Sequence, residues 1–390
     1  MAPRWMSRDV LLISFSAFFA DLGYQAVQAI FPIYLVLTLS ANPSYLGFAN
    51  GIAFGGGALF AYLAGFLGVR HSRKWLAVFG SAFILLMPLV GAAVNPLLAI
   101  ALFASGWWAR NFRVPPRRAM LADAVRKEDL GKTFGFLHAL DIGGGALAVL
   151  ALLAMVYLKF SQNKMLLFAA VPLAVSVALL LVTRDIRRKE RSKPATRIAS
   201  GKIVIEKSAF KGIMAATALY GFSYYSLGFP ILTIAEGSKS VALGILSYGI
   251  YLGVSAFTGY FIGSRKGINK IKALGYLGYI LSGAGTAMLA IGYLLGNVLW
   301  AFYLGVSLMG FGLGVIETLE PSIISLLRGA AKLDIGMGTL QGARSIGLFS
   351  ANVIMGILYV LSPSDSYFYA AAVSMLAGII VLSYGRDFRE

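Results

Sequence analysis

Apolar stretches of roughly twenty residues recur from one end of this chain to the other. A bilayer core about 30 Å thick is crossed by roughly 20 apolar helical residues, because each adds about 1.5 Å. Hydrophobic residues make up 58% of the chain and charged residues only 13%, whereas soluble domains are about 25% charged. The sequence therefore predicts an all-α polytopic membrane protein with twelve transmembrane helices. The predicted spans are 9–38, 45–68, 75–94, 97–117, 133–159, 164–183, 209–234, 241–263, 272–294, 297–320, 337–361 and 366–385.

The positions of the basic residues predict how these spans are oriented. Nearly all of the 34 Lys and Arg lie in alternate connections or in the adjoining helix halves, and the other side keeps only Lys159, Lys164 and Lys239. Because cytoplasmic loops carry the excess of Lys and Arg, we expect a multi-pass protein of the cytoplasmic membrane with both termini cytoplasmic. The net charge of +18 would then face anionic lipid, and we expect no nucleic-acid partner.

The two halves of the chain resemble each other. A basic polar linker, 184–208, separates residues 1–183 from residues 209–390, with six predicted spans in each half. Short matches recur in the same order at a nearly constant spacing, such as Phe31-Pro32-Ile33 with Phe229-Pro230-Ile231. This pattern predicts two pseudo-symmetric six-helix bundles related by an axis along the membrane normal.

Two segments also resemble a known family. GFLGVRHSRK, from Gly65 to Lys74, resembles the hallmark G-x-L-x-D-R-x-G-R-[RK] of the major facilitator superfamily, with Val69 at the aspartate position. RNFRVPPRRAMLADAV, from Arg110, resembles R-x-x-R-x-P-P-R-D-A-L-L-A-D of a bacterial and archaeal branch of these transporters. The resemblance implies the major facilitator fold and solute transport. It also implies a solvated cytoplasmic gating loop with an Arg73–Asp123 pair. Its residues here are Arg70, Arg73, Lys74, Arg113, Arg117 and Asp123.

The first predicted span carries a polar stripe. Asp21 lies near its middle, and Tyr24, Gln25 and Gln28 follow at helical spacing on one side. A charge inside a bilayer costs about 2.5–3.5 kcal/mol, so the stripe is expected to face a cavity rather than lipid. We expect Asp21 to exchange a proton or a cation during transport; the alternative is a fixed hydrogen bond between helices.

Two further pairs of charges lie inside predicted spans. Counting along the helices puts Arg110 near Asp141 in the first half and Glu317 near Arg344 in the second. Each pair either holds two helices together or belongs to a vestibule whose charges exchange partners. Histidine is the side chain whose ordinary charge change falls near neutral pH, so His138, one turn before Asp141, is either a proton relay or a packed side chain.

Aromatic residues could line the cavity between the bundles. Trp107 precedes Arg110 on the fourth span, and Tyr224 and Tyr225 lie in the seventh, where Gly221, Gly228 and Pro230 should bend or break the helix. Aromatic faces in a cavity would hold an amphipathic or cationic solute. Aromatic faces turned toward neighbouring helices would serve packing alone.

Together these features predict a secondary active transporter that works by alternating access. Proton-coupled export of a small amphipathic or cationic compound, by antiport, is the leading hypothesis. The chain has no Cys and no nucleotide-binding loop, so we expect no cofactor, no metal site and no enzymatic activity. The expected partners are the solute, protons and membrane lipid, and we expect a monomer. The alternatives are an uncoupled facilitator, a metal or metabolite transporter, or a transporter-like membrane receptor.

Overall fold

Polar caps set the beginnings of several helices. The Ser7 hydroxyl accepts a hydrogen bond from the Val10 amide at 3.4 Å, and the Asn95 side chain accepts one from Leu98 at 2.9 Å. Ser72 caps the helix that begins at Arg73 in the same way. Each cap satisfies an amide that has no partner within its own helix. Pro96 adds a residue whose backbone favours the first helical position.

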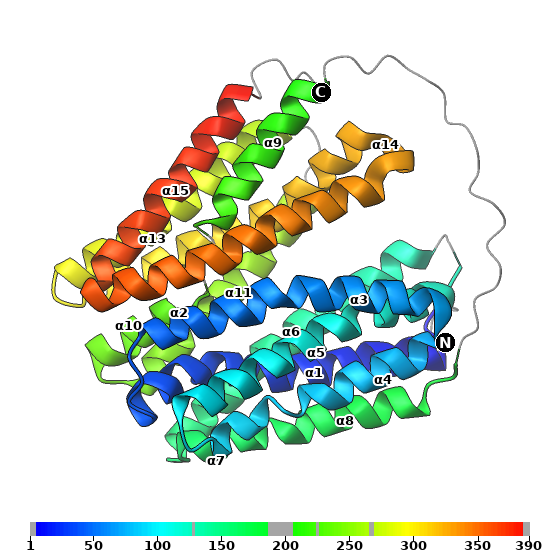
Figure 1. Cartoon of the computed structure of the whole chain (residues 1–390), viewed down its shortest axis with the longest axis horizontal. Coiled ribbons are helices and arrows are strands. Elements are labelled where there is room, and N and C mark those ends of the chain that lie inside the picture. Colours follow the sequence, from blue (N-terminus) through cyan, green and yellow to red (C-terminus); the bar gives the residue numbers. More distant parts are fainter. Residues whose placement is uncertain (1–4, 127–128, 186–205, 224–225, 265–268, 385–390) are drawn as a thin grey trace. The chain divides into compact units, whose positions relative to one another are not determined.

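The computed structural model describes residues 5–126, 129–185, 206–223, 226–264 and 269–384. All the regular structure in these ranges is helical (Figure 1). The chain divides into two units: unit 1 is Met1–Tyr34 with Gly56–Gly201, and unit 2 is Leu35–Gly55 with Lys202–Glu390.

Unit 1 is built from long helices joined by short turns. Its α1 packs against α6 and α8, and α5 packs against α3 and α4. Gly144 lets α6 approach α1 closely, because a Cβ at this position would overlap the carbonyl oxygen of Phe18. The helices are α1 (Arg8–Ile33), α3 (Gly56–Arg70), α4 (Arg73–Ile84), η3 (Pro88–Ala92), α5 (Pro96–Asp123), α6 (Leu130–Tyr157), α7 (Gln162–Phe168) and α8 (Ala170–Val182).

Unit 2 is organised around α14, which packs against α9, α11 and α13 and against the segment formed by α2 and η2. The short η1 (Tyr34–Thr38) lies at the boundary between the units. The helices are α2 (Ser44–Asn50), η2 (Gly51–Gly55), α9 (Glu206–Gly221), α10 (Gly228–Ser238), α11 (Val241–Ser264), α12 (Lys270–Ala273), η5 (Leu274–Ile280), α13 (Leu281–Leu294), α14 (Leu299–Leu361) and α15 (Pro363–Tyr384).

The helix α14 folds back on itself. It runs through Leu299–Leu361 and includes two apolar spans, Leu299–Glu320 and Arg344–Leu361. A straight helix would separate Glu320 from Arg344 by roughly 36 Å, but their side chains are hydrogen-bonded. The two arms of α14 therefore lie side by side, as Figure 1 shows.

Ten helical segments in the described residues are long and apolar enough to cross a membrane. The predicted all-helical membrane fold is therefore confirmed, but the count of twelve is not. The predicted span 97–117 lies in α5, whose second half carries several arginines. The predicted span 209–234 is divided between α9 and α10, which end and begin at Gly221 and Gly228 as the sequence predicted for a broken helix.

Candidate functional site

The polar stripe of α1 is turned into unit 1. Asp21, Tyr24 and Gln28 are buried, and Gln25 is half-buried. The Tyr24 hydroxyl donates a hydrogen bond to Asp21, one turn earlier on the same helix. The Asp21 carboxylate therefore has a fixed partner within α1, and Gly144 of α6 provides the space beside it.

Arg110 of α5 lies over two aromatic rings of this region. Its guanidinium carbon is 5.3 Å from the centre of the Tyr24 ring and 5.2 Å from that of Trp107. It also donates hydrogen bonds of 3.4 Å to the Tyr24 hydroxyl and to Asn111. Such stacking is a cation–π interaction. Trp107 was predicted to offer its ring face to a cationic solute. In the structure the Arg110 guanidinium stacks on this ring instead.

Asp141 is paired with Arg117 rather than with Arg110. The Nη2 of Arg117 lies 3.6 Å from Asp141 Oδ2, and within the described residues no carboxylate forms an ion pair with Arg110. Arg110 and Arg117 are two helical turns apart on one face of α5, so counting depth along the chain could not distinguish them.

The prediction that Arg113 and Arg117 belong to a solvated gating loop is wrong. Their exposed fractions are 1% and 2%, and Arg113 donates a hydrogen bond of 3.5 Å to Ser176 of α8. The reason is that both residues lie within α5, which runs past the predicted end at 117 to Asp123, and that Arg113 packs against Gly80 of α4. The interior of unit 1 thus holds three arginines, at 110, 113 and 117, against two aspartates.

The remaining gating residues lie at the surface of unit 1. Arg73 forms an ion pair with Asp123, as the resemblance implied. Lys74 donates a hydrogen bond to the Leu181 carbonyl at 2.9 Å, and Arg70 lies 5.6 Å from the ring of Phe66. His138 is exposed on α6 and does not join the polar stripe.

In unit 2, Arg344 bridges two glutamates of α14. Its Nη1 lies 2.6 Å from Glu317 and its Nη2 lies 2.7 Å from Glu320. The Glu317 side chain is 52% exposed, whereas that of Glu320 is completely buried. The structure thus brings the predicted Glu317 and Arg344 together and adds a second carboxylate. We call these three residues the Arg344 cluster.

Glu320 accepts further hydrogen bonds that sequence reasoning missed. The Tyr279 hydroxyl of η5 donates to its Oε1, and Thr217 of α9 donates to the same oxygen at 3.2 Å. Glu320 lies one turn after Glu317 on the same face of α14, which is the signal that could have revealed it. Nothing in the sequence marks Thr217 or Tyr279 as its partners.

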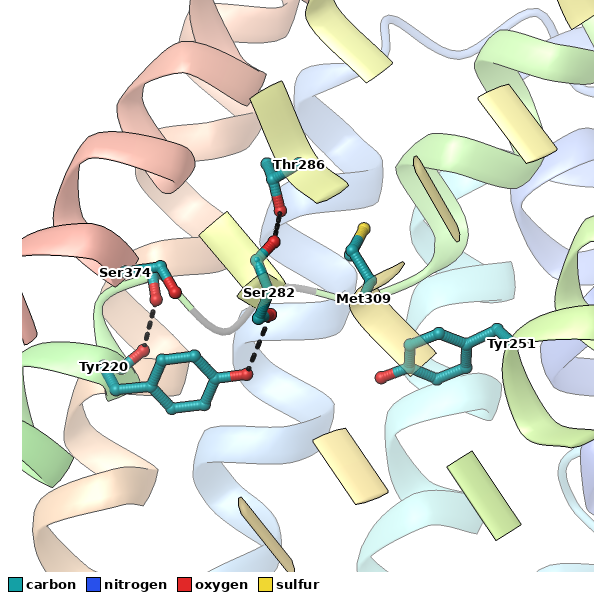
Figure 2. Close-up of a pocket in the computed structure, with 7 residues that line it drawn as sticks. Tyr220, Tyr251, Ser282, Thr286, Met309 and Ser374 are labelled. Carbon is teal, nitrogen blue, oxygen red and sulfur yellow. Dashed lines mark hydrogen bonds between the residues drawn. The ribbon is translucent and has the colours of Figure 1, made fainter. Parts of the chain in front are cut away.

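A polar pocket lies one helical turn from Thr217 and Tyr279, whose hydroxyls contact Glu320. Tyr220 follows Thr217 by three residues on α9, and Ser282 follows Tyr279 by three residues along η5 and α13. The pocket has about 290 Å³ of empty space, part of it open to solvent. The space that the centre of a water-sized group can occupy is near 10 Å³, enough for about one water molecule. Its lining residues, six of them drawn and labelled in Figure 2, are Tyr220, Ser223, Tyr251, Ser282, Thr286, Met309 and Ser374.

Two other predictions remain. Tyr224 and Tyr225, the predicted cavity aromatics of the seventh span, lie outside the described residues. In the part of the chain that the structure describes, no group of three or more His, Asp or Glu side chains could hold a metal ion.

Comparison with known proteins gives a consistent result. The family model described as Major Facilitator Superfamily matches residues 13–292. An uncharacterised MFS-type transporter of Methanocaldococcus jannaschii is 23% identical, over 97% of this chain and 95% of its own length.

Solved structures share the fold at low sequence identity. A mutant form of the nucleoside transporter NupG superposes with a TM-score of 0.75 at 14% identity, over 96% of this chain and 99% of its own. A bacterial homologue of the human lysosomal transporter Spinster gives 0.74 at 15% identity, over 100% of this chain and 98% of its own. At this identity the likeness concerns the fold alone.

Proposed function

Because the chain belongs to the Major Facilitator Superfamily and is a membrane transporter of that type, we propose that it exports a small amphipathic cation in exchange for protons. Members of this superfamily expose a central site alternately to the two sides of the membrane. The proposal concerns what is carried, in which direction, and what drives it.

The Arg344 cluster is the observation that carries this proposal. One arginine lies between two glutamates, so the ionised cluster has a net charge of minus one. An uncompensated charge within a membrane domain is costly. Either a proton or a cationic solute can neutralise it, and Glu317 is exposed enough to meet both. Two ligands that compete for one negative charge are exchanged rather than carried together.

Unit 1 is the less suitable place for the transported proton. The Asp21 carboxylate is hydrogen-bonded to Tyr24, and arginines outnumber aspartates in its surroundings. We therefore propose that Asp21 orders α1 and α5 and that the Arg344 cluster exchanges the proton. An uncoupled facilitator is the alternative function, and the same cluster would then only bind the solute.

The test measures solute flux into proteoliposomes under an imposed pH gradient. Benzylguanidinium is a suitable probe, because a guanidinium stays charged at all accessible pH values and does not leak across lipid as a neutral base. We expect protein-dependent accumulation in the acidic compartment. The same rate with and without the gradient would remove the coupling claim.

A matched variant ties the flux to the cluster. Glu320→Gln keeps the acceptor oxygen for Tyr279 and Thr217 but removes the surplus charge, so accumulation should be lost while equilibration down a solute gradient remains. Accumulation by Glu320→Gln at the wild-type level would show that the cluster does not couple transport.

A further inference from the structure

We propose that the pocket of Figure 2 binds the hydrogen-bond-donating ammonium head of the transported solute, and that it selects primary ammonium over quaternary ammonium. The inference rests on the proposed function, since it names the chemistry of the cation exchanged against the proton.

The first argument concerns the direction of the hydrogen bonds. Three lining hydroxyls already donate their single proton to backbone carbonyls of the same unit. Ser223 donates to Tyr220 at 2.8 Å, Thr286 to Ser282 at 3.0 Å, and Ser374 to Tyr279 at 2.8 Å. A hydroxyl has one proton and two lone pairs. These three groups can therefore only accept a hydrogen bond from a guest.

Three hydroxyls that can only accept favour a guest that donates hydrogen bonds. A primary ammonium has three N–H donors, while an alcohol has one and a quaternary ammonium has none. In Figure 2 the hydroxyl ends of Tyr220 and Tyr251 point toward each other across the same space, and they add oxygen atoms to the lining. An apolar guest could not use these acceptors, and placing it against polar groups is unfavourable.

The second argument concerns charge. The pocket lies one turn, about 4.5 Å along each helix axis, from the Thr217 and Tyr279 hydroxyls that contact Glu320. The Arg344 cluster carries a surplus carboxylate. A cation bound at the pocket therefore lies close to an uncompensated negative charge, which an anion would avoid.

The third argument concerns size. The centre of a water-sized group can occupy about 10 Å³ of the pocket, so the pocket accepts about one such group. An ammonium group, or one N–H₂ corner of a guanidinium, is of this size, and the rest of the solute would leave through the open side. Three N-methyl groups have no room there, because closely packed interiors do not yield the space without cost.

The experiment measures the thermal stabilisation of the purified full-length protein by three probes that share one side chain. They are 2-phenylethylammonium, its N,N,N-trimethyl derivative and the uncharged 2-phenylethanol. We expect saturable stabilisation by the primary ammonium and none by the other two. Equal stabilisation by the trimethyl derivative, or none by any probe, would overturn the proposal; the second result would mean that the pocket holds water only.

Variants assign the binding to the pocket. Thr286→Val keeps the side-chain shape and removes one acceptor, so affinity for the primary ammonium should fall roughly tenfold or more, as for a hydrogen bond to a charged group. Ser223→Ala should act in the same direction. Thr258→Val is the matched control, since Thr258 is a buried threonine of α11 that does not line the pocket. Unchanged affinity in both pocket variants, with the variants folded, would overturn the assignment.

The two proposals fail separately. Flux that depends on the pH gradient, together with equal binding of primary and quaternary ammonium, would leave the exchange mechanism intact and remove the pocket. Selective binding of the primary ammonium, together with flux that does not depend on the pH gradient, would leave the pocket assignment intact and remove the exchange mechanism.

Discussion

The Nη2 of Arg344 lies 2.7 Å from the Oε2 of Glu320, although 24 residues of α14 separate them. Glu320 is completely buried, and the contact joins the two arms of the folded-back helix. Charged hydrogen bonds in a poorly solvated interior are strong, and breaking one leaves a costly unpaired charge. This contact therefore links the packing of unit 2 to the charge state of its interior.

Replacing Arg344 by Leu should destabilise the protein by about 3–5 kcal/mol, because two glutamates remain without their cation. Protonation relieves the repulsion between two carboxylates, so the deficit should shrink as the pH falls and grow as it rises. Thermal unfolding in detergent across a pH series measures this. Arg344→Lys keeps the charge and should recover part of the stability. A deficit that is the same at every pH would contradict this account.

Asp21→Asn should leave the pH dependence of transport close to that of the wild type. The asparagine side chain can still accept the hydrogen bond from Tyr24, so the α1 stripe keeps its geometry while the carboxylate is lost. Proteoliposome flux at several pH values tests this. If the variant loses gradient-driven accumulation while Glu320→Gln keeps it, the proton is exchanged in unit 1 instead.

Gly144→Ala should destabilise unit 1 by about 1–3 kcal/mol, the usual cost of overpacking, because the new Cβ would overlap the Phe18 carbonyl. Gly143→Ala is the matched control. A Cβ there would meet the Phe18 ring at 3.8 Å, an ordinary contact, and alanine is the better helix former. Similar melting temperatures for the two variants would show that α1 and α6 do not need the close approach.

Much of the fold followed from the sequence, because lipid imposes simple rules on a chain. Helices must satisfy their own backbone groups, so apolar stretches of sufficient length predicted most spans. The Glu317 and Arg344 positions were predicted together because an isolated charge in a span requires a partner. The break between α9 and α10 followed from Gly221 and Gly228.

The finer details of the site depended on packing that the sequence does not encode locally. Counting residues along α5 gives only an approximate depth in the membrane, which could not distinguish Arg110 from Arg117 as the partner of Asp141. The resemblance implied that Arg113 and Arg117 belong to a solvated gating loop, whereas the structure buries both side chains within α5. Thr217 and Tyr279 are ordinary residues of their helices until α9, η5 and α14 come together around Glu320.

The most direct test of the account is the affinity for benzylguanidinium as a function of pH. If proton and cation compete for the surplus charge of the Arg344 cluster, the apparent dissociation constant should rise by up to about tenfold for each pH unit of acidification. Glu317→Gln and Glu320→Gln should each flatten this dependence, because either leaves one arginine with one glutamate. A dissociation constant that does not change with pH in the wild-type protein, or one that changes as steeply in both variants as in the wild type, would contradict the exchange mechanism.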